Sequence, residues 1–246
     1  TARARKSTTT STITRTGTAM TTAIEALPLL RLLQLSSPAL PVGAYSYSQG
    51  LEWAVEDGTV RDAATAQRWI GDVLRYTMGR FEAPVWLRLH AAWQRDDLDA
   101  VAHWNARFLA SRESAELRAE TLQMGYSLRA LLRDLRELDV APLDAFDALC
   151  YPTAAAFAAA RWRIDAQAGL VAYLWAWAEN LAMAALKAVP LGQAAGQRML
   201  SALLPALESA AREAATLADA ELSNFAPGLA MASSLHETQY SRLFRS

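Results

Sequence analysis

Residues 33–52 read LQLSSPALPVGAYSYSQGLE and separate two helical patterns. Pro38 and Pro41 each lack a backbone N–H and push the preceding residue away from helical angles. Gly43 then permits a turn that other residues resist. The YSYSQG that follows, residues 45–50, combines two phenols, two small hydroxyls and an amide. Because a buried strand would leave so many polar groups without partners, we predict that this stretch is a surface that binds something.

The rest of the chain favours helix. Ala and Leu dominate and β-branched residues are sparse. TVRD at 59–62 has capping-box spacing and opens a helix in which Trp69, Ile70 and Val73 recur at the helical period. No run shows sustained two-residue alternation, so we predict an all-α protein, a single helical-bundle-like domain of about eight to ten helices. The other predicted helices cover residues 27–35, 48–57, 84–94, 98–111, 113–137, 153–164, 166–187 and 193–217.

Composition limits the function classes. The formal net charge of -1 over 246 residues argues against general affinity for nucleic acid or anionic lipid. The single cysteine, Cys150, cannot form an internal disulfide and fits a reducing, cytoplasmic compartment. The longest uncharged apolar run, residues 168–178, is shorter than the roughly 20 residues that cross a bilayer. We therefore predict no membrane span.

The first nineteen residues, TARARKSTTTSTITRTGTA, differ from all that follows. They are rich in Thr, Ser and Arg, and they contain no acidic residue. Such a segment buries too little apolar surface to offset its ordering entropy. We predict a disordered extension over residues 1–19, either cloning-derived or mis-started, with an organellar signal as the alternative. The folded domain is expected over residues 20–246.

The metal-binding side chains are poorly spaced for chelation. His90, His103, His236 and Cys150 show no H-x-H, H-x-x-x-H or C-x-x-C pattern. His90 and His103 lie in helical patterns beside tryptophans, where packed, hydrogen-bonded histidines are expected. We predict no stable metal site, and His236, next to Glu237, is at most a weak transient ligand.

Catalytic signatures are also missing from the sequence. DDLD at 96–99 resembles an acidic magnesium motif, but its spacing is wrong and it suits the start of the next helix. The only lysines are Lys6 and Lys187, and neither follows a phosphate-binding loop. Cys150 reads as a small buried hydrophobe. The sequence therefore predicts a protein that is not an enzyme and binds no cofactor.

The C-terminal segment, residues 225–246, ends in a dense group of contact-forming side chains. Pro and Gly at 227–228 are expected to break any helix. Tyr240 and Phe244 then lie close to Arg242 and Arg245, and these residue types are enriched at interface centres. We predict that this tail adds little to the core and becomes ordered on a partner.

Three blocks of the chain resemble one family. They are residues 33–52, VPLGQ at 189–193, and FAPGLAMASSLHETQYSRLFRS at 225–246. Their order and separation resemble those of the UreF family of urease accessory proteins. The resemblance implies a non-catalytic, all-α homodimer that bridges UreD (also called UreH) and the GTPase UreG. The complex, not this chain, would handle nickel and GTP and deliver nickel to the urease apoenzyme.

The same resemblance suggests two surfaces. The side facing the GTPase would comprise Tyr45, Tyr47, Gln49, Glu52, Lys187, Pro190, Gly192 and Gln193. The tail facing UreD would comprise His236, Glu237, Gln239, Tyr240, Arg242, Leu243, Phe244 and Arg245.

Several alternatives remain open at this point. Glu52 could be a solvated residue on a helix face, and Lys187 could complement a helix dipole. The protein could activate or gate UreG through an arginine such as Arg198 or through a surface contact. It could also be a small helical enzyme with a pocket lined by Tyr45 and Tyr47.

Overall fold

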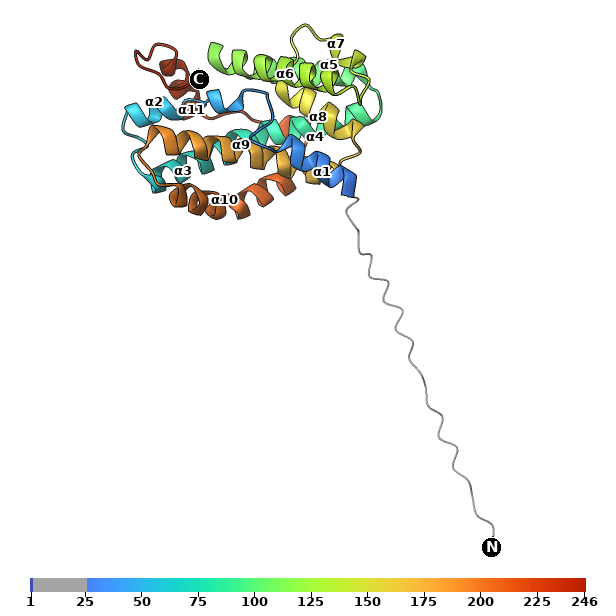
Figure 1. The fold of residues 1–246 in the computed structure, drawn as a ribbon, viewed down its shortest axis with the longest axis horizontal. Coiled ribbons are helices and arrows are strands. Elements are labelled where there is room, and N and C mark those ends of the chain that lie inside the picture. The colour runs from blue at the N-terminus through green and yellow to red at the C-terminus, as the bar shows by residue number, and fades with distance from the viewer. Residues whose placement is uncertain (2–25) are drawn as a thin grey trace.

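The computed structural model describes residue 1 and residues 26–246, so the predicted extension at 1–19 lies almost wholly outside the described residues. Within 26–246 the secondary structure is helical and no strand occurs (Figure 1). Counting α3, η2 and α4 as one continuous helix, this part of the chain contains ten α-helices, which confirms the all-α prediction. The elements are α1 (Ala26–Leu35), η1 (Ala44–Ser46), α2 (Leu51–Glu56), α3 (Ala63–Val73), η2 (Leu74–Glu82), α4 (Ala83–Gln94), α5 (Leu98–Ala110), α6 (Ala115–Leu135), α7 (Ala141–Asp144), α8 (Tyr151–Arg161), α9 (Ala166–Ala188), α10 (Gln193–Ala214), η3 (Asp219–Glu221) and α11 (Pro227–His236).

The sequence predicted a separate helix from residue 84. In the structure, the helix that begins at Ala63 instead continues through Pro84. Residues 74–82 form a π-helical segment that joins α3 to α4, and Pro84 lies in the first turn after it. Proline cannot donate to the carbonyl four residues earlier. That carbonyl belongs to Arg80, and it accepts the Ser223 N–H instead (3.1 Å). The wider turn thus keeps the helix continuous across the proline.

The start of this helix also differs in detail from the prediction. Asp62 is the N-cap, and its carboxylate accepts the Thr65 N–H at 2.8 Å. Thr65 Oγ1 accepts the Asp62 N–H in return, at 3.0 Å. The capping box therefore begins at Asp62 and not at Thr59.

Helix α9 is the central helix of the fold. It packs against α1, α2, α3, α4, α8 and α10, and it crosses the middle of the molecule in Figure 1. Among the described helices it is the one long and apolar enough, by length and composition, to cross a membrane. Core helices pass the same test, and packing on six neighbours is the behaviour of a core helix.

Helices α6 and α8 approach each other closely at a glycine. A Cβ atom added to Gly125 would lie 2.1 Å from the Leu149 carbonyl oxygen, just before α8. Asn105 of α5 fixes the same segment, because its Oδ1 accepts the Cys150 N–H (3.0 Å) and the Thr153 hydroxyl (2.8 Å). Cys150 is fully buried, as predicted, and burial raises the pKa of its thiol to about 12.

The prediction that 227–228 breaks any helix is wrong. Pro227 is the first residue of α11, a position where its missing N–H costs nothing and its fixed φ suits a helix. Helix α11 packs against α2 and α6, so the C-terminal segment lies beside residues 33–52, which we call the N-terminal motif (Figure 1). Two stretches separated by most of the chain therefore form one side of the molecule.

Candidate functional site

The N-terminal motif is held in place by two glycines with left-handed backbones. Gly43 (φ 80°) precedes the short turn η1, and Gly50 (φ 76°) precedes α2. A Cβ on Gly50 would also lie 2.9 Å from the Ser233 backbone nitrogen of α11. Gly50 therefore meets two demands, a positive φ and close backbone contact with α11.

The last residues of the chain are bonded to this motif along its length. The Arg245 N–H donates to the Ser46 carbonyl at 2.8 Å. The Ser48 N–H and hydroxyl both donate to the Ser246 carbonyl, at 2.6 and 2.5 Å. Ser48 and Ser246 are fully buried. The tail thus packs on its own chain through residues 46–48.

Glu52 attaches the tail through both of its carboxylate oxygens. One carboxylate oxygen accepts the Leu243 N–H (2.6 Å) and the other accepts the Phe244 N–H (2.9 Å). The Glu52 side chain is 8% exposed. It is therefore neither a solvated residue of a helix face nor a surface residue that could contact a GTPase, and both interpretations are corrected.

The tail also contributes to the core, contrary to the prediction. Phe244 is 6% exposed, and its ring lies 5.6 Å from Lys187 Nζ at the end of α9. Lys187 itself is exposed. Lys187, predicted to face the GTPase, therefore covers the ring of Phe244, predicted to face UreD. The two predicted surfaces adjoin each other at this point.

His236 lies between two carboxylates. Its Nδ1 is 2.6 Å from Glu116 Oε2 of α6, and its Nε2 is 3.2 Å from Glu52 Oε2. Arg242 binds the other oxygen of Glu116 at 2.8 Å. His236 is fully buried. Both ring nitrogens are thus occupied, which removes the reason for considering His236 as a transient metal ligand.

The other predicted metal-binding side chains are also dispersed. His90 is buried, with Nε2 3.1 Å from the Ile164 carbonyl oxygen, and burial lowers its pKa. His103 is exposed, so its prediction as a packed histidine is wrong. Asp97 caps α5 by accepting the Ala100 N–H, as expected of residues 96–99. Across residues 26–246, no group of three or more His, Cys, Asp or Glu side chains could hold a metal ion.

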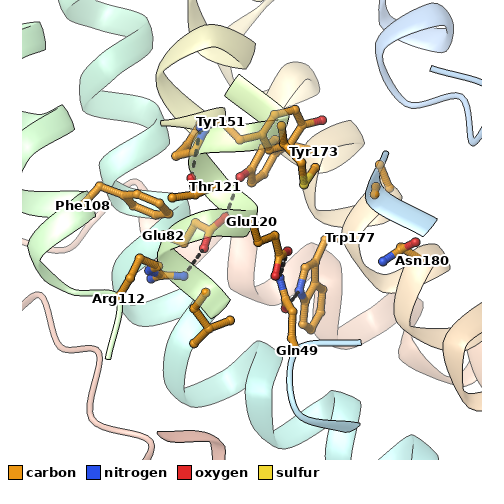
Figure 2. A pocket seen from close by; sticks show the side chains of 15 residues that line it. Gln49, Glu82, Phe108, Arg112, Glu120, Thr121, Tyr151, Tyr173, Trp177 and Asn180 are labelled. Carbon is orange, nitrogen blue, oxygen red and sulfur yellow. Dashed lines mark hydrogen bonds and ion pairs between the residues drawn. The ribbon is translucent and has the colours of Figure 1, made fainter. Parts of the chain in front are cut away.

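A small cavity of about 70 Å³, lined by both polar and apolar side chains, lies behind the motif (Figure 2). At its wall Gln49 bridges two helices, because its amide donates to Glu120 of α6 (2.8 Å) and accepts from the Trp177 ring of α9 (2.8 Å). The Ser246 hydroxyl donates to the other Glu120 oxygen at 3.0 Å. Burial raises the pKa of Glu120 to about 7. Gln49, one of the predicted GTPase-facing residues, thus points inward.

The opposite wall of the cavity carries a buried charge pair. Arg112 Nη1 lies 3.3 Å from Glu82, and the Tyr173 hydroxyl donates to the same carboxylate (Figure 2). Burial raises the pKa of the Tyr173 hydroxyl well above its ordinary value. Every charged group around the cavity has a partner, and no hydroxyl or thiol is activated as a nucleophile. Tyr45 is 67% exposed and Tyr47 is 5% exposed, so these two side chains do not form a common substrate pocket.

The predicted site residues thus divide into two sets. The inward set is buried or bonded within the chain, and it comprises Tyr47, Gln49, Glu52, His236 and Phe244. The outward set is exposed, and it comprises Tyr45, Lys187, Pro190, Gly192, Gln193, Glu237, Tyr240, Arg242, Leu243 and Arg245. Gln239 is half-buried.

Sequence reasoning missed several residues of this region. Glu116 and Glu120 lie one helical turn apart on one face of α6. Neither residue is part of a recognisable sequence motif. Phe225, just before α11, and Met231, within it, are 77% and 62% exposed. Their exposure depends on how α11 packs, so no local pattern could have revealed it.

Comparison with known proteins supports one family. The sequence model of the UreF family matches residues 60–204. The chain is similar to the urease accessory protein UreF of Azoarcus sp. (strain BH72), with 62% identity over 225 residues, 89% of this chain and 96% of that protein. It is also similar to the proteins of the same name from Dechloromonas aromatica (strain RCB), at 56% identity over 224 residues (89% and 98% of the two chains), and Janthinobacterium sp. (strain Marseille), at 54% over 226 residues (91% and 100%).

Proposed function

The chain belongs to the UreF family of urease accessory proteins, and on that premise we propose that it is a scaffold that joins two partners during urease maturation. As a member of this family it is an accessory protein and not an enzyme. The partners we propose are UreD, also called UreH, and the nickel-carrying GTPase UreG. The assembled complex would insert nickel into the urease apoenzyme with GTP hydrolysis, in the cytoplasm.

One observation carries the proposal: the tail is bonded to the N-terminal motif while its largest side chains remain uncovered. Glu52 holds the backbone at Leu243 and Phe244, yet the Leu243 side chain is 71% exposed and Tyr240 is wholly exposed. Phe225, just before α11, and Met231, within it, are also exposed. Exposed apolar side chains that are grouped and held by a rigid backbone are typical of a protein-binding surface. We propose that UreD binds here.

The GTPase is proposed to bind the adjoining surface. Lys187 ends α9, and Pro190, Gly192 and Gln193 form the exposed connection to α10. Lys187 lies over the Phe244 ring, so this surface is continuous with the tail. A partner bound at the tail would therefore border one bound at Lys187, and the two could assemble on one side of the scaffold.

The homodimer is proposed to form through α1. Leu27, Leu30 and Leu33 are each more than half exposed on this helix. A groove of about 940 Å³ lies between α1 and α9, with Val171 and Trp175 in its wall. An exposed leucine-rich helix beside an apolar groove fits a second copy of the same helix and groove.

Co-purification tests the proposed function. The full chain is mixed with UreD and UreG, with and without GTP, and the complexes are separated by size. We expect a complex of all three proteins that fails to form when UreD is omitted or when Tyr240 and Leu243 are both replaced by Ala. UreG and UreD that remain separate from this chain under every nucleotide condition would refute the scaffold role.

A further inference from the structure

The side chains that hold the tail form a compact group of four charges. Glu52 comes from α2, Glu116 from α6, His236 from the end of α11 and Arg242 from the tail. We name these four residues the tail clasp. His236 is fully buried, Glu52 is 8% exposed and Glu116 is 13% exposed, whereas Arg242 is 41% exposed. The clasp is thus centred on a histidine that has no access to water.

The bonds made by the two glutamates limit where a proton can lie. Glu52 accepts backbone N–H groups on both of its oxygens, from Leu243 and Phe244. Glu116 accepts the Arg242 guanidinium on one oxygen at 2.8 Å. Because both oxygens of Glu52 accept a backbone N–H, a proton on either oxygen would place a donor against a donor, so Glu52 is bonded as a carboxylate. Glu116 Oε2 faces only His236, and a proton in that contact is shared by Glu116 and His236.

The proton count of His236 follows from these partners. Its Nδ1 faces Glu116 at 2.6 Å and its Nε2 faces Glu52 at 3.2 Å. A neutral imidazole has one N–H and one lone pair, and the lone pair would then face a carboxylate inside the protein. The two contacts are satisfied by an imidazolium beside a carboxylate, or by a neutral imidazole that accepts from a protonated Glu116, and both forms hold one more proton than a neutral histidine beside a carboxylate. With Glu52 and Arg242 the group is neutral overall in either form, as buried charges require.

From this geometry we propose that the tail clasp closes with uptake of one proton by the contact between His236 and Glu116, so that docking of the tail weakens as the pH rises above neutrality. A histidine that is free in water is mostly neutral above about pH 6.5. Closure must then bind a proton, and a one-proton equilibrium changes by at most about tenfold for each pH unit. The relevance of the clasp to partner binding rests on the proposed function, but the clasp itself is a property of the isolated chain.

Other titratable groups lie near the clasp and must be separated from it. Glu120 of α6 accepts the Ser246 hydroxyl, and its burial places its ionisation close to neutral pH. Glu237, beside His236, accepts the Ala115 N–H at the start of α6. Lys187 of α9 lies over Phe244 but contacts no clasp carboxylate. Glu120→Gln therefore serves as the background in which the clasp is tested.

Hydrogen exchange of the Leu243 and Phe244 amides reports the closed state directly, because both N–H groups donate to Glu52. Exchange is measured on the full chain carrying Glu120→Gln at pH 6, 7 and 8, with correction for the intrinsic exchange rate. We expect the protection factor to fall about tenfold between pH 7 and pH 8. His103→Gln, which changes an exposed histidine, is the matched control and is expected to leave this fall unchanged.

A second variant keeps the bonds and removes the need for the proton. In Glu116→Gln, the new amide can donate to Nδ1 of a neutral His236, while Nε2–H still donates to Glu52. We expect protection in this variant to change by less than about twofold between pH 6 and pH 8, with the tail docked throughout.

The proposal is overturned if protection in the parent chain is independent of pH, or if Glu116→Gln shows the same pH dependence as the parent. Co-purification with UreD at pH 6 and pH 8 is then a separate readout. If the clasp opens as the pH rises but the chain binds UreD at neither pH, the proposed function is refuted and the clasp proposal still holds.

Discussion

The Glu52 carboxylate accepts the Phe244 backbone N–H at 2.9 Å, although 192 positions separate the two residues in the chain. This bond joins the first of the family-like blocks to the last one. It also separates the backbone of the tail, which belongs to the domain, from the exposed side chains of Tyr240 and Leu243, which are available to a partner. The tail is therefore a part of the fold that carries a binding surface.

Replacing Glu52 is expected to destabilise the protein. Glu52→Ala would leave the Leu243 and Phe244 N–H groups and the buried His236 without their acceptor. Removing one member of a buried charged network costs about 3 kcal/mol. Urea unfolding measures this loss. Glu56→Ala, at the exposed end of the same helix α2, is the matched control and is expected to change the free energy of unfolding by less than about 0.5 kcal/mol.

Equal and small effects of Glu52→Ala and Glu56→Ala would mean that the tail is not held as described. A change in partner binding without a loss of stability would likewise return Glu52 to a surface role.

Glu120 is expected to make stability depend on pH. Burial raises the pKa of its carboxyl from 4.5 to about 7. A raised carboxyl pKa means that the folded state binds the proton more tightly than the unfolded state does. The stabilisation that this tighter proton binding gives the folded state is fully present below about pH 4.5 and is lost as the pH rises to about 7. Its upper bound is roughly 3 kcal/mol.

Glu120→Gln removes this titration while keeping an amide that can bond Gln49 and Ser246. We expect the variant to be more stable than the parent at pH 8, and its advantage to shrink as the pH falls toward 5. Chemical unfolding at a series of pH values tests this. Glu208→Gln, on the exposed face of α10, is expected to follow the parent at every pH.

The helices were largely predictable because their periodicity is local. Prediction of α5, α6, α9 and α10 succeeded within a few residues, since capping residues such as Ser114 and apolar spacing lie in the same stretch of chain. The breaks at prolines were not predictable in the same way. Pro84 follows a π-helical segment in which the Arg80 carbonyl accepts the N–H of Ser223, a residue distant in the sequence. Pro227 is tolerated because it is the first residue of α11.

The site was predictable as a set of residues but not as a geometry. The motif and the tail were identified from composition, yet the direction in which each side chain points depends on contacts between them. Glu52 is buried because Leu243 and Phe244 reach it from the far end of the chain. No periodicity within residues 45–52 encodes that contact, so exposure of Glu52 was the wrong inference.

Close packing of α6 on α8 is expected to make Gly125 intolerant of any side chain. A methyl group at this position would meet the Leu149 carbonyl oxygen at 2.1 Å, which is backbone and cannot rotate away. We expect Gly125→Ala to cost about 3 kcal/mol or more, measured by thermal or urea unfolding. Gly228→Ala meets nothing within 4 Å and is expected to be neutral or slightly stabilising. Similar stabilities for the two variants would contradict the packing of α6.

The dimer proposal is tested by a charge on α1. Leu30 is 61% exposed, so Leu30→Glu is expected to leave the monomer folded while it prevents burial of this helix against a second copy. Sedimentation equilibrium should then show a dimer for the parent and a monomer for Leu30→Glu. Leu204→Glu changes a leucine of similar exposure on α10 and is expected to remain dimeric. A dimer that survives Leu30→Glu would exclude α1 from the interface.

The most direct test of the central claim is the affinity of UreD for the tail surface. Tyr240 and Tyr126 are both exposed tyrosines, one on the tail and the other on α6, and Leu243 and Leu204 form a similar pair. Affinity is measured by calorimetry for the double variant Tyr240→Ala with Leu243→Ala, and for the control Tyr126→Ala with Leu204→Ala. Truncating two interface anchors that each contribute about 2 kcal/mol predicts a loss of about 1000-fold in the first variant and almost none in the second. Equal affinity of UreD for both variants would contradict the assignment of the tail as its binding surface.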